Sequence, residues 1–311
     1  MDTIAVVLEA PEQLTLRRLD LRAVEAADVV VEIDFSGIST GTERLLYSGR
    51  MPAFPGMGYP LVPGYESVGH VVEAGADARA QLGQRVFVPG ANCYTDARGL
   101  FGGAARRVIV PAARTVPVAE SLGQEAVLIA LAATAYHALI AGPLPDLIVG
   151  HGVLGRLLAR ITLALGGAAP TVWETNATRS TGAEGYAVIH PDADERRDYH
   201  VIQDVSGDAA LLDTLIGRLA FGGEIVLAGF YESALSFTFP PAFMREAKFR
   251  IAAQWQPADL VATTALIDSG ALSLAGLITH QSAAEHAASA YPVAFGDAAC
   301  LKMVLDWSGC A

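Results

Sequence analysis

The sequence predicts an α/β protein in which a small, twisted β-barrel-like domain is followed by a domain built around a parallel sheet. Residues 1–120 contain short apolar segments separated by clusters of Gly and Pro, a pattern typical of a small barrel. From residue 147 onward, strand-like and helix-like segments alternate, which indicates a parallel sheet with helices on its faces. A glycine-rich turn joins the first of these strands to the first of these helices. A chain of 311 residues is long enough for two domains with separate cores.

The first domain is expected to consist of short strands joined by turns. The stretch 51–60 is rich in Pro and Gly and separates two of the apolar segments. The expected strands are 4–8, 29–35, 67–73, 85–88 and 107–110.

The pattern changes after Ser121. A helix is expected over 123–141, and the Gly-Pro-Leu-Pro sequence that follows ends it. The next expected elements are strands 147–150, 171–175, 186–189, 200–205 and 224–229, with helices 153–165 and 208–219. The stretch 234–255 is rich in aromatic residues and Pro, and the tail is expected to form helices 258–269 and 283–295 and a strand 300–306.

The turn Gly150-x-Gly152-x-x-Gly155 has the spacing of a dinucleotide-binding motif. Gly150 permits the tight turn, Gly152 lets the backbone approach a pyrophosphate, and Gly155 lets the helix pack closely on the strand. The helix N-terminus then offers free N–H groups and a partial positive charge to phosphates. The motif therefore predicts a nicotinamide dinucleotide as cofactor.

An acidic residue, Glu174, follows the next expected strand and is placed to bind the ribose hydroxyls. A carboxylate there would repel a 2′-phosphate, so NAD is favoured over NADP. His151 either lies over the pyrophosphate or faces solvent. The residues predicted to bind the cofactor are Gly150, His151, Gly152, Val153, Leu154, Gly155, Glu174 and Thr134.

The charge and the cysteine content exclude several classes of protein. The net charge of −12 makes nucleic acid or an anionic membrane surface an improbable partner. The three cysteines, Cys93, Cys300 and Cys310, form no Cys-x-x-Cys pair, which argues against a disulfide framework and fits the cytoplasm. The longest apolar run, 126–141, is shorter than the roughly 20 residues that cross a bilayer, so a membrane span is not expected.

Motifs along the whole chain resemble those of the medium-chain dehydrogenase/reductase family, which contains zinc alcohol dehydrogenases and quinone reductases. The matching blocks are 29–49, 62–69, 82–86, 102–117, 265–270 and 277–280. The resemblance implies a GroES-like β-barrel catalytic domain formed by both ends of the chain, with a Rossmann domain inserted between them. The expected division is 1–122, 123–256 and 257–311. It also implies a homodimer paired along the edge of the Rossmann sheet, with 239–255 as the matching segment.

The residues that bind catalytic zinc in that family have no counterparts in this chain. The expected cysteine falls on Ser39 or Thr40, the expected histidine on Tyr65, and the third ligand near Ala130. Hydroxyl groups and a neutral phenol are poor zinc ligands, so no metal is predicted. A residual site on Glu43 and Glu66 is the alternative.

Further blocks resemble a narrower group of these dehydrogenases, those that act on tetrapyrrole pigments in bacteriochlorophyll synthesis. These blocks are 36–43, 55–66, 131–137, 239–245 and 300–307. The resemblance implies a tetrapyrrole substrate and NAD-dependent oxidation of a 1-hydroxyethyl side chain to acetyl. The alternatives are a zinc-free quinone or enone reductase and a non-catalytic pigment carrier.

Without zinc, a protein group must take the hydroxyl proton of the alcohol. The candidates are Tyr65, Glu66, Ser39 and Thr40. Each also has a structural interpretation: a packed phenol for Tyr65, an inward carboxylate paired with an arginine for Glu66, and turn-forming hydroxyls for Ser39 and Thr40.

Large apolar residues in turn-rich stretches are candidates for a pocket that holds a flat hydrophobic substrate. They are Phe54, Met57, Tyr59, Phe101, Phe230 and Tyr231. The alternative is that they close a domain or subunit interface.

Overall fold

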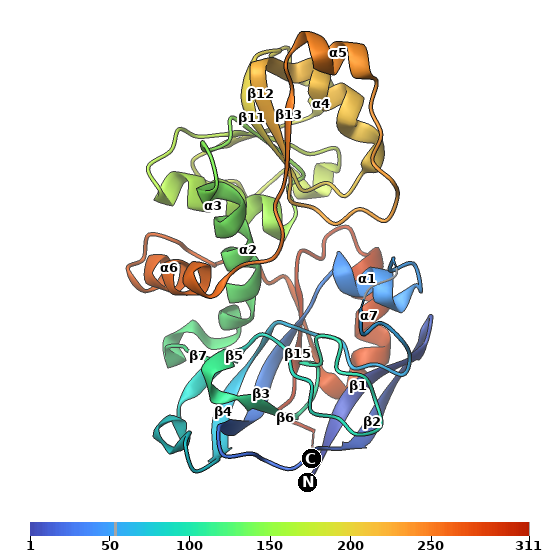
Figure 1. Cartoon of the computed structure of the whole chain (residues 1–311), viewed down its shortest axis with the longest axis vertical. Helices are drawn as coiled ribbons and strands as arrows, with labels where there is room; N and C mark the ends of the chain where they lie inside the picture. The colour runs from blue at the N-terminus through green and yellow to red at the C-terminus, as the bar shows by residue number, and fades with distance from the viewer. Residues whose placement is uncertain (53–54, 311) are drawn as a thin grey trace. The chain divides into compact units, whose positions relative to one another are not determined.

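The computed structural model describes residues 1–52 and 55–310, and the chain forms two compact units (Figure 1). The first comprises Met1–Ala130 and Leu277–Ala311, and the second comprises Leu131–Gly276. Both boundaries lie later in the chain than the expected ones at 122/123 and 256/257. The expected α/β architecture, with a GroES-like unit and a Rossmann unit, is confirmed.

The first unit is built mainly on antiparallel strands. A two-stranded ribbon pairs β1 (Asp2–Ala10) with β2 (Gln13–Asp20). The larger sheet has the order β14 (His280–Ala283), β15 (Met303–Asp306), β3 (Asp28–Ile38), β4 (Ser67–Ala74), β5 (Arg85–Val88) and β7 (Val116–Pro117), and β6 (Arg107–Pro111) also pairs with β3. Strands β14 and β15 form a parallel pair. The five strands expected in this part correspond to β1, β3, β4, β5 and β6. The ribbon strand β2 was not expected.

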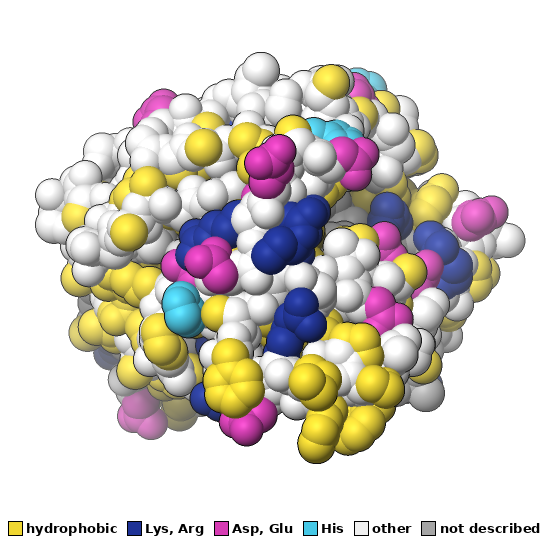
Figure 2. Space-filling model, turned by 90° about the horizontal axis from the view of Figure 1, so that it is seen from above, with side chains coloured by type: hydrophobic (Ala, Val, Ile, Leu, Met, Phe, Trp, Pro, Cys, Tyr) yellow, Lys and Arg dark blue, Asp and Glu magenta, His cyan; other side chains and the backbone are white. Residues whose placement is uncertain are grey.

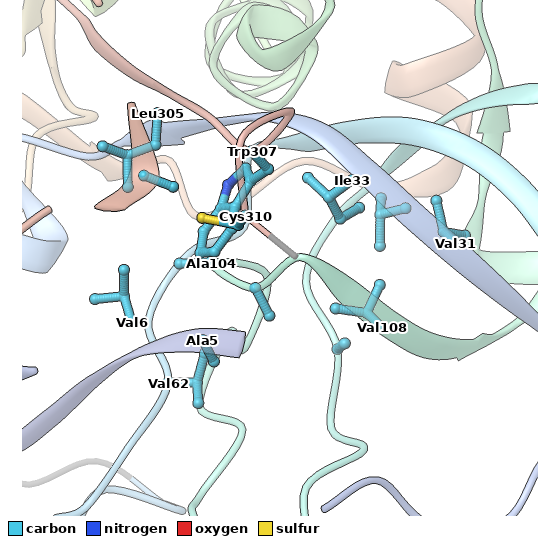
Figure 3. Close-up of a cluster of buried hydrophobic side chains, with 14 of the residues drawn as sticks. Ala5, Val6, Val31, Ile33, Val62, Ala104, Val108, Leu305, Trp307 and Cys310 are labelled. Atoms are coloured by element: carbon cyan, nitrogen blue, oxygen red, sulfur yellow. The ribbon is translucent and has the colours of Figure 1, made fainter. Parts of the chain in front are cut away.

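Residues from both ends of the chain share the core of this unit (Figure 3). Trp307 follows β15, is fully buried, and donates its indole N–H to Ser36 Oγ at 2.8 Å. Antiparallel pairing of β15 with β3 brings Leu305 opposite Ser36. The N-terminal strands are thus completed by the C-terminal segment, which explains why the unit is discontinuous.

Two helices of this unit matter for the site. Helix α1 (Thr42–Tyr47) follows the end of β3, and α7 (Ala287–Gly296) precedes β15. Short 3₁₀ turns occupy η1 (Arg79–Gln81), η2 (Ala112–Arg114) and η7 (Ala284–His286).

The second unit contains a wholly parallel sheet. Its order is β10 (Ala187–Ile189), β9 (Thr171–Trp173), β8 (Leu147–Val149), β11 (Tyr199–Asp204), β12 (Leu219–Leu227) and β13 (Lys248–Ile251). The longer helices are α2 (Ile129–Ile140), α3 (Val153–Ala164), α4 (Leu212–Arg218), α5 (Phe239–Met244) and α6 (Pro257–Asp268), with 3₁₀ turns η4 (Ala177–Arg179), η5 (Pro191–Ala193) and η6 (Ala209–Leu211). The strand order changes direction at β8, where a doubly wound sheet binds its ligand.

One helical stretch, Glu120–Ile140, is long and apolar enough to be a candidate membrane span among the described residues. It joins η3 (Glu120–Leu128) to α2, and Gly123 interrupts it with a non-helical φ of 50°. Over its most apolar window, 56% is buried within the protein, so it is weak evidence for a span, because core helices share these properties.

Candidate active site

The glycine turn in the second unit connects β8 to α3 with the geometry that its sequence predicts. Gly150 has a φ of 104°, a region in which residues with a Cβ are strained. At Gly155, a Cβ would lie 1.8 Å from the carbonyl oxygen of Gly150, so only glycine lets the helix approach this closely. Both glycines are therefore required by the backbone.

The start of α3 suits a phosphate group. Gly152 precedes the helix and provides no side-chain cap, so the N–H groups of the first turn, including those of Val153 and Leu154, remain free for a ligand. A Cβ on Gly152 would meet nothing within 4 Å, which shows open space beside the turn. These residues fit the pyrophosphate of a dinucleotide.

Glu174 lies directly after β9, beside the glycine turn. Its Oε2 accepts the backbone N–H of His151 at 3.0 Å, and its Oε1 accepts the N–H of Asn176 at 2.8 Å. The side chain is half-buried. These two bonds hold the carboxylate at the carboxyl end of the sheet, where an acidic residue binds ribose hydroxyls in dinucleotide folds. Thr134 lies half-buried on α2.

The side chain of His151 takes neither of its two expected positions. It is completely buried, with Nδ1 2.6 Å from the carbonyl oxygen of Arg179 and Nε2 2.9 Å from the hydroxyl of Tyr186. A carbonyl only accepts, so Nδ1 carries the hydrogen and Nε2 accepts from Tyr186. Burial lowers the pKa of His151, which favours this neutral form.

A buried arginine holds the same loop. Arg156, only 5% exposed, follows Gly155 on α3. Its guanidinium donates to the carbonyl oxygens of His151, Arg179, Thr181 and Gly182 at 2.7–3.1 Å. The loop 176–182 is thereby tied to the glycine turn. The Gly-x-Gly-x-x-Gly pattern alone contains no signal for this contact.

In the first unit, the positions that correspond to zinc ligands form a hydroxyl cluster. Ser39 Oγ lies 2.6 Å from the hydroxyl of Tyr65, and Thr42, at the start of α1, lowers the pKa of that phenol. Burial raises the pKa of Tyr65, and the nearby charge of Glu66 raises it further. The phenol is therefore neutral near pH 7 and serves as a hydrogen-bonding group, not as a free base. Thr40 is half-buried beside Ser39.

Glu66 forms a buried ion pair, as its structural interpretation predicted, but its partner is a lysine and not the expected arginine. Lys302 Nζ, on the segment leading into β15, lies 2.6 Å from Glu66 Oε2 and 3.2 Å from the carbonyl oxygen of Ile38. Glu66 is 0% exposed and Lys302 is 1% exposed. The sequence signal that could have revealed this pair is the single lysine, Lys302, within the apolar segment 300–306.

Glu43 is a second buried carboxylate in the cluster. It accepts the N–H of Ser39 at 3.1 Å and the hydroxyl hydrogen of Tyr291, on α7, at 2.8 Å. Burial raises the pKa of Glu43 to about 7, although both hydrogen bonds lower it. Tyr291, Lys302 and Thr42 are the members of this cluster that sequence reasoning missed.

The donor set does not fit catalytic zinc. In the part of the chain that the structure describes, no three His, Cys, Asp or Glu side chains gather in a way that could hold a metal ion. At the residual site on Glu43 and Glu66, Ser39 and Tyr291 engage the two oxygens of Glu43, and Lys302 engages Oε2 of Glu66. Oε1 of Glu66 is buried without a hydrogen-bond partner among the described residues. Glu43 and Glu66 offer only carboxylate oxygens, and neither provides the thiolate or imidazole ligands typical of catalytic zinc sites.

The predicted pocket residues divide between the two units. Met57, Tyr59 and Phe101 are partly buried and pack on a small apolar cluster of Leu8, Leu46 and Leu61. Phe101 also contacts the Tyr65 ring edge-on, with centroids 5.2 Å apart. Phe54 lies outside the described residues.

The other two pocket candidates belong to the second unit. Phe230 is 46% exposed, whereas Tyr231 donates its hydroxyl hydrogen to Asp204 Oδ2 at 2.8 Å. Asp204 ends β11, and burial raises its pKa. Tyr231 is thus anchored at the same edge of the sheet as the glycine turn.

Comparisons with known proteins agree with this architecture. Residues 25–120 match the alcohol dehydrogenase GroES-like domain. The chain is 60% identical to the 2-desacetyl-2-hydroxyethyl bacteriochlorophyllide A dehydrogenase of Cereibacter sphaeroides, over 100% of both chains. It is 58% identical to the protein of the same name from Rhodobacter capsulatus, over 99% of both chains.

The fold is also that of a solved structure described as a short chain alcohol dehydrogenase from Escherichia coli CFT073, complexed with NADH. The TM-score is 0.84 at 19% identity, and the match covers 98% of this chain and 99% of the other. Given the full-length relatives, the chain belongs to the medium-chain dehydrogenase/reductase family, a family of oxidoreductases.

Proposed function

We propose that this protein is an NAD-dependent dehydrogenase that oxidises the 1-hydroxyethyl group of a bacteriochlorophyllide to an acetyl group. The observation that carries the proposal is the 60% identity over the full length of a relative named for this substrate. The reaction belongs to bacteriochlorophyll a synthesis, and we place it in the cytoplasm.

The chemistry requires two transfers from the substrate. The carbinol carbon would give up a hydride, which NAD⁺ would accept, and the hydroxyl group would lose its proton. The products are the acetyl group, NADH and one proton. When bound, the coenzyme supplies the hydride acceptor, and the protein provides binding, orientation and the route for the proton.

The residues of the glycine turn support dinucleotide binding, and Glu174 supports NAD over NADP. The N–H groups at the start of α3 would bind the pyrophosphate, and the Glu174 carboxylate would accept hydrogen bonds from the ribose hydroxyls. A 2′-phosphate at that position would meet a like charge.

The hydroxyl cluster supports proton transfer without a metal. Tyr65 would hydrogen-bond the substrate oxygen, and its bond with Ser39 would pass the proton on. Glu66 is held by Lys302, so its role is to maintain the charge balance of the cluster. This donor set supports a reaction without zinc.

The test is NADH formation with hydroxyethyl-bacteriochlorophyllide, measured with NAD and with NADP. We expect turnover with NAD, a much weaker response with NADP, and no loss of rate after treatment with a strong zinc chelator. Pigment binding without any redox change would instead indicate a carrier and overturn the proposal. The Glu174→Gln variant tests the role of this carboxylate. Its ratio of activity with NAD to activity with NADP should be smaller than that of the wild type.

We also propose that the protein forms a homodimer through the edge of the parallel sheet at β13. This edge and α5 carry exposed apolar side chains. Figure 2 shows the end of the molecule at which α4 and α5 lie in Figure 1. A hollow of about 490 Å³ is lined there by Phe221, Phe237, Phe239, Phe243, Met244 and Phe249, among others. Such patches indicate contact surfaces. Light scattering should show a dimer, and Phe239→Glu should shift it towards monomer.

A further inference from the structure

Arg98 is an exposed cation without a protein partner among the described residues. Its side chain forms no hydrogen bond or ion pair with them, whereas the nearby Asp96 is engaged by Arg17 at 3.5 Å. Some other arginines of the first unit, such as Arg107 with Glu32, are paired with carboxylates. An unpaired guanidinium has five N–H donors available for an anion.

The position of Arg98 is fixed by the backbone. Its N–H donates to the carbonyl oxygen of Pro60 at 3.0 Å, and its own carbonyl accepts from Val62 at 2.8 Å. The side chain lies against Gly58. A Cβ added there would fall 2.6 Å from the guanidinium Nε of Arg98. Glycine at position 58 therefore makes room for the arginine.

An apolar surface begins beside this cation and leads to the hydroxyl cluster. Met57, Tyr59 and Leu100 are partly buried, as is Phe101, whose ring contacts Tyr65. Two residues lie between Arg98 and Phe101, so their Cα atoms are at most about 11 Å apart. A flat macrocycle can span that distance, with one edge at Phe101, beside Tyr65, and another at Arg98.

We propose that Arg98 is an anion subsite that binds the free carboxylate of the tetrapyrrole substrate. The inference rests on the proposed function, because a chlorophyllide-type pigment is an acid whose propionate side chain is not esterified. Arginine binds carboxylates in a two-pronged geometry that a lysine does not offer. A chain of net charge −12 repels anions at long range, so a local unpaired cation is needed to select one.

The experiment compares the pigment free acid with its methyl ester, which keeps the macrocycle and removes the charge. Dissociation constants are measured by quenching of pigment fluorescence for wild type, Arg98→Gln, Arg98→Lys and the control Arg79→Gln. Arg79 is an exposed arginine on η1. We expect wild type and Arg79→Gln to bind the acid about tenfold more tightly than the ester, and Arg98→Gln to lose this difference. Arg98→Lys should keep only part of it.

Equal affinity of wild type for acid and ester would overturn the proposal, and so would an acid preference that survives in Arg98→Gln. Because binding is measured without turnover, the result is independent of the redox assay. An acid preference that depends on Arg98, combined with no NADH formation, would leave the subsite standing and reject the proposed function. Gly58→Ala, which pushes the guanidinium aside, should reduce the acid preference as well.

Discussion

The ammonium group of Lys302 lies 2.6 Å from Oε2 of Glu66, and both side chains are shielded from water. Their positions in the chain differ by 236 residues, so the contact joins the C-terminal segment to the start of β4. A buried carboxylate without its cation is costly, because water no longer solvates it.

The first prediction concerns this pair. Lys302→Met should lower the free energy of unfolding by about 3–5 kcal/mol, since it leaves Glu66 charged and unpaired. Urea denaturation measures the change. Lys248, the other lysine, is exposed on β13, and Lys248→Met is the matched control with an expected change below about 0.5 kcal/mol. Equal effects of the two substitutions would show that the pair does not stabilise the fold.

Glu43 predicts a pH dependence of stability. Burial raises its pKa to about 7 in the folded protein, above the ordinary value of 4.5. The folded state therefore binds more protons than the unfolded state between these values, and its stability falls as pH rises through that window. The slope from one such group is at most about 1.4 kcal/mol per pH unit.

Glu43→Gln removes the titrating group and should abolish this part of the slope. Unfolding measured at several pH values between 5 and 8, for wild type and the variant, checks the prediction. If the difference in stability between the two proteins were constant across that range, the carboxylate would not titrate there.

The buried hydrogen bonds of His151 lead to a prediction about the KM for NAD. His151→Leu removes the donor to the Arg179 carbonyl and should loosen the loop 176–182, which follows Glu174. We expect the KM for NAD to rise about tenfold, because the loss of one buried hydrogen bond costs a free energy that corresponds to this ratio. The kcat at saturating NAD should be unchanged. His151→Asn, which keeps an N–H near Nδ1, should recover part of the loss.

The control for that series is His200→Gln, an exposed position on β11. It should leave both kinetic constants unchanged. A fall in kcat in His151→Leu, with KM for NAD unaffected, would contradict a role in positioning the coenzyme loop.

Tyr65 predicts a loss of rate without a loss of coenzyme binding. Tyr65→Phe removes the hydroxyl that bonds Ser39 and should lower kcat by about 10²-fold or more, the usual range for a proton-transfer group. The KM for NAD should stay constant, because the residue belongs to the first unit. Tyr47→Phe is the matched control, with an exposed hydroxyl and only a long contact of 3.5 Å to Glu12. Full activity in Tyr65→Phe would remove the phenol from the mechanism.

Features encoded locally could be predicted from the sequence. The glycine turn is one, because the conformations at Gly150 and Gly155 depend on a few neighbouring residues. The expected strands of the first unit have clear Gly and Pro boundaries. By contrast, β2 is mostly polar, its alternation is broken at Arg17–Arg18, and it pairs only with β1. Strand β13 is a short, mostly exposed edge strand.

The buried contacts of the site could not be predicted, because their partners are distant in the chain. Tyr291 and Glu43 are separated by 248 residues, and no local pattern connects them. His151 occupies a variable position of its motif, and its burial depends on Tyr186 and Arg179. Long-range pairing of polar groups is decided by the packed fold and not by spacing.

The discontinuous first unit also sets an order of assembly. During synthesis, residues 131–276 leave the ribosome as one continuous block and have every strand of their parallel sheet before the chain is finished. The first unit cannot be completed before β15 and Trp307 have been synthesised. Until this last segment emerges, Glu43 lacks Tyr291 and Glu66 lacks Lys302. The hydroxyl cluster consequently takes shape last, on a protein whose coenzyme-binding half has already had time to fold.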